Sequence, residues 1–183
     1  MRQLKYAEKK LLKHTDFFKW EVDNNLNEVK IMKKFMIQRR EDYTLYNKMA
    51  RETRELANKI KAMDPKDPFR AEASGKLLEK LYTMGLIPTK WNLQLCDGVK
   101  ATSFCRRRLP CLMVRNKMTP DLRSAVTFIE QGHIRVGAEV VKDPAFLVTR
   151  PLEDYVTWVN TSAIRKHVKQ YNEERDDFDL NNC

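Results

Sequence analysis

The sequence contains no long apolar stretch. No run approaches the roughly 18 consecutive apolar residues that a membrane-spanning helix needs. The opening segment "MRQLKYAEKK" also lacks the apolar region of a secretory signal peptide. These two absences lead us to expect a soluble, intracellular protein without a membrane partner.

Metal ligands are sparse and scattered. The chain has four cysteines and three histidines. No two cysteines form a C-x-x-C pair and the histidines lie far apart, whereas zinc sites are usually marked by closely spaced pairs. We therefore expect no metal site, and we expect the cysteines to be reduced thiols: Cys96, Cys105, Cys111 and Cys183.

Catalytic motifs are absent as well. The sequence has only five glycines, and none lies in a phosphate-cradling loop. No G-x-S-x-G or H-E-x-x-H grouping occurs. Acidic pairs such as Glu41-Asp42 and Asp176-Asp177 fit helix-cap and tail positions. We expect no catalysis, no cofactor and no small-molecule substrate.

Positive charge, by contrast, is abundant. The 35 lysines and arginines exceed the 25 acidic residues, which gives a net charge of +10 and a pI of about 9.5. Such a balance favours an anionic partner, either nucleic acid, an acidic membrane surface or an acidic protein. The length of 183 residues suits one domain with an extension, or two small domains.

The first part of the chain shows helical spacing of its apolar residues. Residues 38–63 carry one such stripe, which ends at Asp64-Pro65. A second helix is predicted to begin at Asp67-Pro68 and to stop at Gly85. The sequence thus predicts a helical hairpin whose stripes form a core, followed by a connecting loop over residues 86–100.

A basic arm precedes this hairpin. Lysines surround scattered leucines, and the aromatic residues Phe17, Phe18 and Trp20 follow them. These rings could bind a partner protein, or they could fold back onto the main body. The sequence leaves both interpretations open.

The segment "SFCRRRLPCLMVRNKM" places three consecutive arginines before an apolar stretch. Six basic residues and no acidic one occur from Lys100 up to Asp121. Pro110 would cost about 3 kcal/mol inside a long helix but little in the first turn of a new one, so two helices are predicted to meet there. Most charge runs are solvated helix ends, and the alternative here is a phosphate-binding edge.

Short β-rich runs follow the next predicted helix, which extends from Thr119-Pro120 to Gln131-Gly132. Residues 133–136 and 139–142 flank Gly137-Ala138, and glycine at the first central position fits a two-residue type II′ hairpin turn. "DYVTWV", residues 154–159, alternates like a half-buried strand. The sequence therefore predicts an α+β, mostly helical fold.

Two of these motifs carry a family resemblance. "IEQGHIRVG" followed by "VVKDPAFLVTR" resembles the αL RNA-binding motif of a primary-binding protein of the small ribosomal subunit, of pseudouridine synthases and of bacterial tyrosyl-tRNA synthetases. The segments "RREDYTLYNKMARETRELANKI", "LLEKLYTMGLIPTK", "FCRRRLP" and "EDYVTWV" further resemble the αL-domain RNA-binding proteins of the U3 small nucleolar ribonucleoprotein, part of the small-subunit processome. This second resemblance spans nearly the whole chain.

The resemblance implies a non-catalytic RNA-binding subunit that acts in the nucleolus. Its implied role is to promote pairing of U3 RNA with pre-ribosomal RNA during 18S rRNA processing. The implied partners are U3 small nucleolar RNA, pre-ribosomal RNA and the M-phase phosphoprotein scaffold of the processome. Two alternatives remain, a structural protein of the mature small ribosomal subunit and an RNA-modifying enzyme that bears an αL domain.

The resemblance also divides the chain and directs attention to particular side chains. The expected segments are a basic arm and short helix (1–37), a helical hairpin with its loop (38–100), an αL domain of two helices packed on a small hairpin sheet (101–160), and a C-terminal helix with an acidic tail (161–183). Cationic side chains bind phosphate. The expected RNA-binding residues are Arg106, Arg107, Arg108, Arg115, Lys117, Arg123, His133, Arg135 and Lys142, and the expected partner-binding residues are Phe17, Phe18 and Trp20.

Overall fold

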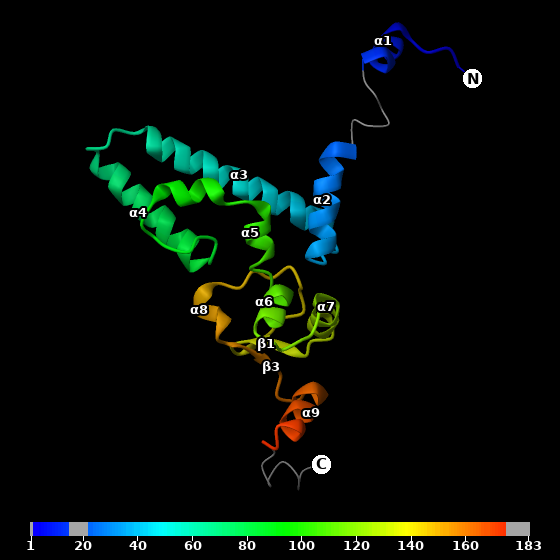
Figure 1. Ribbon diagram of the computed structural model, residues 1–183, viewed down its shortest axis with the longest axis vertical. Coiled ribbons are helices and arrows are strands. Elements are labelled where there is room, and N and C mark those ends of the chain that lie inside the picture. Colours follow the sequence, from blue (N-terminus) through cyan, green and yellow to red (C-terminus); the bar gives the residue numbers. More distant parts are fainter. Residues whose placement is uncertain (1, 15–21, 175–183) are drawn as a thin grey trace.

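The protein is mostly helical and carries one small antiparallel sheet (Figure 1). Its structure, a computed structural model, describes residues 2–14 and 22–174. The elements are α1 (Tyr6–His14), α2 (Val22–Lys34), α3 (Arg40–Ala62), α4 (Pro68–Thr83), the 3-10 helix η1 (Leu93–Gly98), α5 (Ala101–Cys105), α6 (Leu109–Arg115), α7 (Leu122–Glu130), β1 (Ile134–Val136), β2 (Glu139–Val140), α8 (Arg150–Glu153), β3 (Val156–Trp158) and α9 (Ala163–Tyr171). This confirms the predicted α+β, mostly helical fold class.

Helices α3 and α4 form the predicted hairpin and lie side by side in Figure 1. The carboxylate of Asp67 accepts a hydrogen bond of 2.9 Å from the backbone N–H of Phe69 and so caps α4. Pro68 occupies the first helical position, where its missing N–H costs nothing. The local sequence signals therefore place this helix start correctly.

Gly85 ends α4. Its φ is +74°, and the N–H of Leu86 reaches back to the carbonyl of Leu81 at 3.0 Å, which closes the last turn. A Cβ atom at this position would lie 2.8 Å from Cζ of Arg107. Glycine thus provides both the left-handed turn and the room that the arginine side chain needs.

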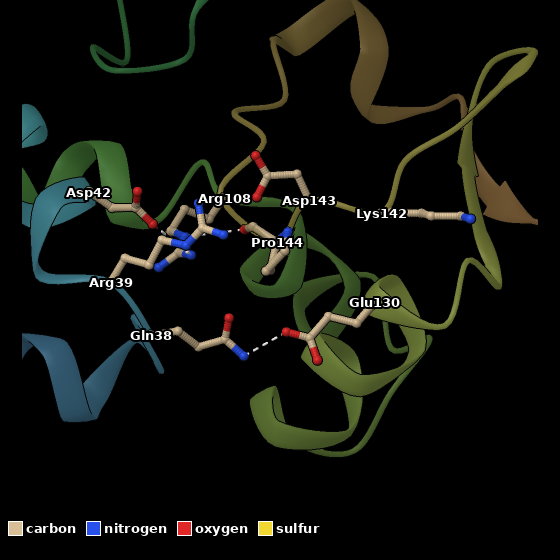
Figure 2. A pocket seen from close by; sticks show the side chains of 8 residues that line it. All are labelled: Gln38, Arg39, Asp42, Arg108, Glu130, Lys142, Asp143 and Pro144. Atoms are coloured by element: carbon tan, nitrogen blue, oxygen red, sulfur yellow. Dashed lines mark hydrogen bonds and ion pairs between the residues drawn. The ribbon is translucent and has the colours of Figure 1, made fainter.

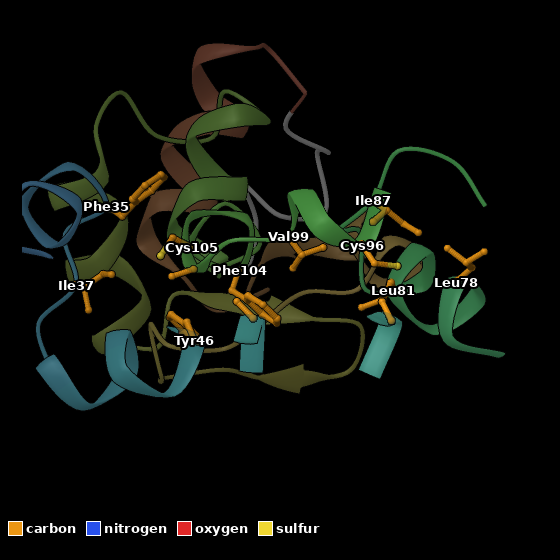
Figure 3. Packing of buried hydrophobic residues seen from close by; sticks show 13 residues of the cluster. Phe35, Ile37, Tyr46, Leu78, Leu81, Ile87, Cys96, Val99, Phe104 and Cys105 are labelled. Atoms are coloured by element: carbon orange, nitrogen blue, oxygen red, sulfur yellow. The ribbon is translucent and has the colours of Figure 1, made fainter. Parts of the chain in front are cut away.

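One hydrophobic cluster joins α3, α4, η1 and α5, which we call the helical unit (Figure 3). The rings of Tyr46 and Phe104 stack in parallel with centroids 6.0 Å apart. Residues 86–100 were predicted as a connecting loop, but they bury Ile87, Cys96 and Val99 in this cluster. The side chain of Asn92 caps η1, so the loop prediction is wrong for residues 93–98, whereas residues 86–92 form a loop that packs on the core.

The cysteines of this region are thiols. Cys96, Cys105 and Cys111 are free, and Cys183 lies outside the described residues. Burial raises the pKa of Cys105 to about 11, with the nearby Arg108 opposing the shift. Cys105 therefore stays protonated near neutral pH and behaves as a small apolar core residue.

A second hydrophobic cluster joins α6, α7 and the sheet, which we call the αL unit. The strand order is β2-β1-β3 with antiparallel pairing throughout. Ile134 and Val136 of β1 point into the cluster, and Arg135 between them lies on the opposite face. One face of the small sheet is thus covered by helices, and the other carries a cation.

The joint between the two units lies at Arg106–Arg108, between the end of α5 and the start of α6. Pro110 occupies the second position of α6, which confirms the predicted meeting of two helices. The backbone of residues 146–148 runs alongside this joint, since Phe146 accepts from the N–H of Leu109 and Val148 donates to the carbonyl of Arg107, both at 2.9 Å. The two hydrophobic clusters meet here, and α5 packs against α3. The four-segment division of the chain remains a proposal.

The hairpin turn has the predicted register. Val136 pairs with Glu139, so Gly137 and Ala138 form a two-residue loop. Gly137 has φ +63°, whereas Ala138 keeps an ordinary negative φ, as a type II′ turn requires.

Gly137→Val is expected to destabilise the protein more than Ala138→Val. A β-branched residue at positive φ costs on the order of 1–2 kcal/mol. No atom lies within 4 Å of a Cβ placed on Gly137, so the difference would come from the backbone alone. Thermal denaturation of both variants measures it, and equal losses would show that the backbone at Gly137 does not favour glycine.

No helix in residues 2–14 or 22–174 combines the length and the apolar composition of a membrane span. Helix α9 follows β3 and has no buried residue. Its first turn is fixed by Ser162, whose hydroxyl accepts a hydrogen bond from the N–H of Ile164. This helix is therefore attached to the αL unit mainly through its N-terminal end.

Candidate nucleic-acid interface

Arg107 lies inside the protein. Its side chain is only 7% exposed, and its Nε and Nη2 both donate to the carbonyl oxygen of Val148 at 3.0 and 2.7 Å. Nη1 donates to the carboxylate of Glu153 at 3.0 Å. Desolvation, with a smaller contribution from the nearby Arg150, lowers the pKa of Arg107. The prediction that this residue contacts RNA is wrong, because its hydrogen-bonding groups are used within the protein.

Arg108 is also buried, with 1% of its side chain exposed. Figure 2 shows its guanidinium group between Asp42 of α3 and Pro144, which lies just before residues 146–148 in the chain. Nη2 lies 3.6 Å from the Asp42 carboxylate, and Nε donates to the Pro144 carbonyl at 3.2 Å. The RNA-binding prediction for Arg108 is wrong because the side chain is buried, although its Nη1 has no hydrogen-bond partner among the described residues. Both arginines connect the helical unit to the αL unit.

Arg106 and Arg115 are the exposed members of this stretch. Arg106 follows α5 and points outward, and it has no ion pair among the described residues. Arg115 is 56% exposed but forms an ion pair with Glu153, the same carboxylate that Arg107 uses. Arg106 is thus available to an anionic ligand, whereas the charge of Arg115 is already partly neutralised by Glu153 of α8.

Lys117 adopts an unusual backbone conformation. It is exposed and has φ +58°, in the turn where the N–H of Met118 reaches back to the carbonyl of Met113 at 2.9 Å. Glycine is the usual residue at such a helix end, and a lysine there costs on the order of 1 kcal/mol. The ammonium group extends from the loop between α6 and α7, which makes Lys117 a strong candidate contact.

Two further cations lie near opposite ends of α7. Arg123 is exposed in the first turn of the helix. Lys142 follows β2, and its side chain passes over Gly132 at the other end of α7, since a Cβ on that glycine would lie 3.2 Å from Cε of the lysine. The structure therefore places the end of the β1–β2 hairpin against the C-terminal end of α7. Arg123 carries a positive charge near the start of this helix, and Lys142 carries one near its end.

Arg135 lies in β1, and His133 is the residue just before this strand. The Nδ1 atom of His133 lies 3.0 Å from the hydroxyl of Ser162, and its ring meets that of Phe128 edge-on. This histidine helps to hold the start of α9, and it is half-buried. Arg135 is half-buried on the open face of the sheet, where its Nε donates to the hydroxyl of Thr157 at 3.0 Å. Of these two, Arg135 is the better candidate for contact with RNA.

The structure also adds a residue that was not predicted. Arg165 of α9 lies in the same surface pocket as Arg135, together with Met118, Val156, Thr157 and Trp158. The sequence signal was the basic run "RKHVK" directly after the Ser162 cap, but it lies outside the segment that resembles the αL motif. Phe17, Phe18 and Trp20, the predicted partner-binding residues, lie outside the described residues.

Exposed cations without an ion pair occur on both units, and on the helical unit they include Lys59, Lys66 and Lys80 among the described residues. On the helical unit, Lys48, Arg51 and Lys76 each pair with a glutamate one helical turn away. On the αL unit and at the joint before it, five exposed or half-buried cations have no carboxylate partner among the residues that the structure describes: Arg106, Lys117, Arg123, Arg135 and Lys142. Unpaired cations are the ones that attract phosphate most strongly.

Comparisons with known proteins show the family of the chain. Residues 3–106 match the family described as ribosomal protein S4/S9 N-terminal domain. The chain is 57% identical to the U3 small nucleolar ribonucleoprotein protein IMP3 of Mus musculus over 181 residues, 98% of both chains. It is 47% identical to the Saccharomyces cerevisiae protein of that name, over 98% of this chain and 99% of the relative. It is 30% identical to the small ribosomal subunit protein uS4 of Caldivirga maquilingensis, over 80% and 81% of the two chains. The chain therefore belongs to the IMP3 family of U3 small nucleolar ribonucleoprotein proteins.

Proposed function

We propose that this chain is a non-catalytic RNA-binding subunit of the U3 small nucleolar ribonucleoprotein and acts in ribosome biogenesis. The observation that carries the proposal is a set of cations without a carboxylate partner among the described residues, one at the joint (Arg106) and four on the αL unit (Lys117, Arg123, Arg135 and Lys142). Phosphate contacts dominate the affinity of such surfaces for RNA. The names of the relatives identify the particle.

The finer proposal is that the protein promotes pairing of U3 RNA with pre-ribosomal RNA. Its proposed partners are these two RNAs and the M-phase phosphoprotein scaffold, and its proposed location is the nucleolus. A protein can shift a pairing equilibrium only if it binds the duplex better than the separate strands. Cations spread over two helices and a hairpin suit the backbone of an A-form duplex, whose major-groove edges are inaccessible.

We expect the protein to speed and favour annealing of U3 RNA to its pre-ribosomal target without ATP. Binding energy is the only source for this effect, since the chain has no phosphate-cradling glycine loop. The measurement is a fluorescence annealing assay with short labelled strands at near-physiological salt.

The controls separate shape from bare charge. Polylysine at matched positive charge measures simple screening of phosphate repulsion. The variant Lys117→Gln, Arg123→Gln, Lys142→Gln measures the contribution of the αL unit. If polylysine equals the protein, or if the variant equals the wild type, the protein has no specific annealing role and would be a structural bridge between RNA and scaffold.

A second candidate function is a structural role in the mature small ribosomal subunit. The similarity to uS4 favours it, but the identity of 30% over 80% of the chain is well below the 57% and 47% found for the IMP3 relatives. Sedimentation of cell extracts tests the two proposals. A biogenesis factor leaves before the mature particle forms, so stable co-sedimentation with mature small subunits would favour the ribosomal role.

A further inference from the structure

A small pocket opens at the edge of the sheet, away from the joint that holds Arg107 and Arg108. Three parts of the chain line it: Met118 from the loop between α6 and α7, Arg135, Val156, Thr157 and Trp158 from the sheet, and Arg165 from α9. β3 is an edge strand in the order β2-β1-β3, so no further strand covers this side among the described residues. The pocket therefore joins the C-terminal helix to the αL unit.

Both arginines of this pocket are held in place by neutral groups. Nε of Arg135 donates to the hydroxyl of Thr157 at 3.0 Å, its register partner on β3. Nη1 of Arg165 donates to the side-chain oxygen of Asn160, in the turn before α9. Because hydroxyl and amide oxygens carry no net charge, these bonds orient the guanidinium groups and leave their positive charge uncompensated.

No carboxylate lines this pocket, in contrast to the one around Arg108, which contains Asp42, Glu130 and Asp143. Neither Arg135 nor Arg165 forms an ion pair within residues 2–14 and 22–174. Two half-buried like charges that share one pocket repel each other unless an anion lies between them. The charge pattern thus favours an anionic ligand.

The apolar part of the pocket narrows the choice of anion. Met118, Val156 and Trp158 form it, and the Trp158 ring is fixed edge-on against Phe128 with centroids 5.9 Å apart. A free phosphate would gain nothing from such a surface, whereas the sugar or base next to a phosphodiester could pack on it. The lining therefore fits one nucleotide of an RNA chain.

The start of α9 is anchored well enough to position Arg165. The hydroxyl of Ser162 lies 3.0 Å from Nδ1 of His133 and also accepts from the N–H of Ile164. The N–H of Val159 donates to the His133 carbonyl at 2.9 Å. The first turn of α9 is thus fixed to β1, the strand that carries Arg135.

We propose that this pocket binds a phosphodiester of RNA between Arg135 and Arg165, so that α9 forms a further wall of the RNA interface. This inference rests on the proposed RNA-binding function and assigns part of it to a helix beyond the αL motif. Arg165 supplies the second half of a two-arginine phosphate clamp.

The test compares two neighbouring substitutions on α9. Arg165→Gln is expected to weaken binding of in vitro transcribed U3 RNA about three- to tenfold and to reduce the salt slope of binding by about one. Lys166→Gln removes the same charge from an exposed position that does not line the pocket, and it is expected to change affinity less than twofold. Fluorescence polarisation at several salt concentrations measures both.

Since α9 has no buried residue, both variants should keep the melting temperature of the wild type, which thermal denaturation checks. Equal weakening of RNA binding by the two variants would overturn the proposed phosphate site, because the positive charge of α9 as a whole would then explain the effect. An Arg165→Gln protein with wild-type affinity and slope would overturn it too. In that case the variant Lys117→Gln, Arg123→Gln, Lys142→Gln decides the wider question: if it has lost binding, the proposed RNA-binding function stands without the pocket, and if it has not, both fail.

Discussion

Arg107→Ala is expected to lower the free energy of unfolding by about 3 kcal/mol, because it removes the hydrogen-bond donors of a buried carbonyl and one of the two cations that pair with Glu153. Three N–H groups of this side chain bond to Val148 and Glu153, and alanine would leave the buried Val148 carbonyl without these donors. Chemical denaturation with urea measures the loss. A change below about 1 kcal/mol would contradict the structural role that we assign to this arginine.

Arg106→Ala is the matched control. It removes the same side chain from the neighbouring residue, which is exposed and has no ion pair among the described residues, so its effect on stability should stay within about 0.5 kcal/mol. A variant that replaces all three arginines would therefore lose stability as well as charge. Its RNA-binding defect alone would not identify an RNA contact.

The variant Lys117→Gln, Arg123→Gln, Lys142→Gln is expected to bind U3 RNA about a hundredfold more weakly at physiological salt. Each lost phosphate contact should reduce the salt slope by about one, or about three in total. The three side chains are exposed and have no carboxylate partner in the described part of the chain, so the fold should tolerate their replacement. Polarisation titrations over a range of salt concentrations give both quantities.

A charge-matched control comes from the helical unit. Lys48→Gln, Arg51→Gln, Lys76→Gln removes the same net charge from exposed side chains that pair with glutamates on their own helices. We expect affinity to change less than threefold, because screened surface pairs contribute little. If this control weakens binding as much as the αL variant, the RNA-binding surface is spread over both units and our assignment to the αL unit is wrong.

Local signals in the sequence predicted several boundaries well, although α7 begins at Leu122 after the Asp121 cap and not at the predicted Thr119-Pro120. Asp67-Pro68, Gly85, Pro110 and Gly137 each act through backbone conformation or a cap within a few residues, so a short stretch of sequence contains the necessary information. The burial of residues 86–100 was not predicted, because it depends on contacts with α3, which lies far away in the sequence. No local pattern records such contacts.

The binding site was only partly predictable for a related reason. Arg106, Arg107 and Arg108 are identical in type, and contacts with distant segments, among them residues 144–148, decide which of them are buried. The positive charge was evident from composition, but its partners were not. Arg165 was missed because it reaches the sheet only after the chain has turned at Ser162.

Gly85 and Arg107 restrict one another across two segments of the chain. Any side chain at position 85 would meet the Arg107 guanidinium group, at 2.8 Å from Cζ for the first carbon alone. In the wild type, Gly85→Ala would therefore suffer both from its left-handed backbone and from the displaced arginine. Once position 107 carries a small residue, only the backbone penalty remains. The two positions thus form an epistatic pair, and their tolerance to mutation can be understood only when they are considered together.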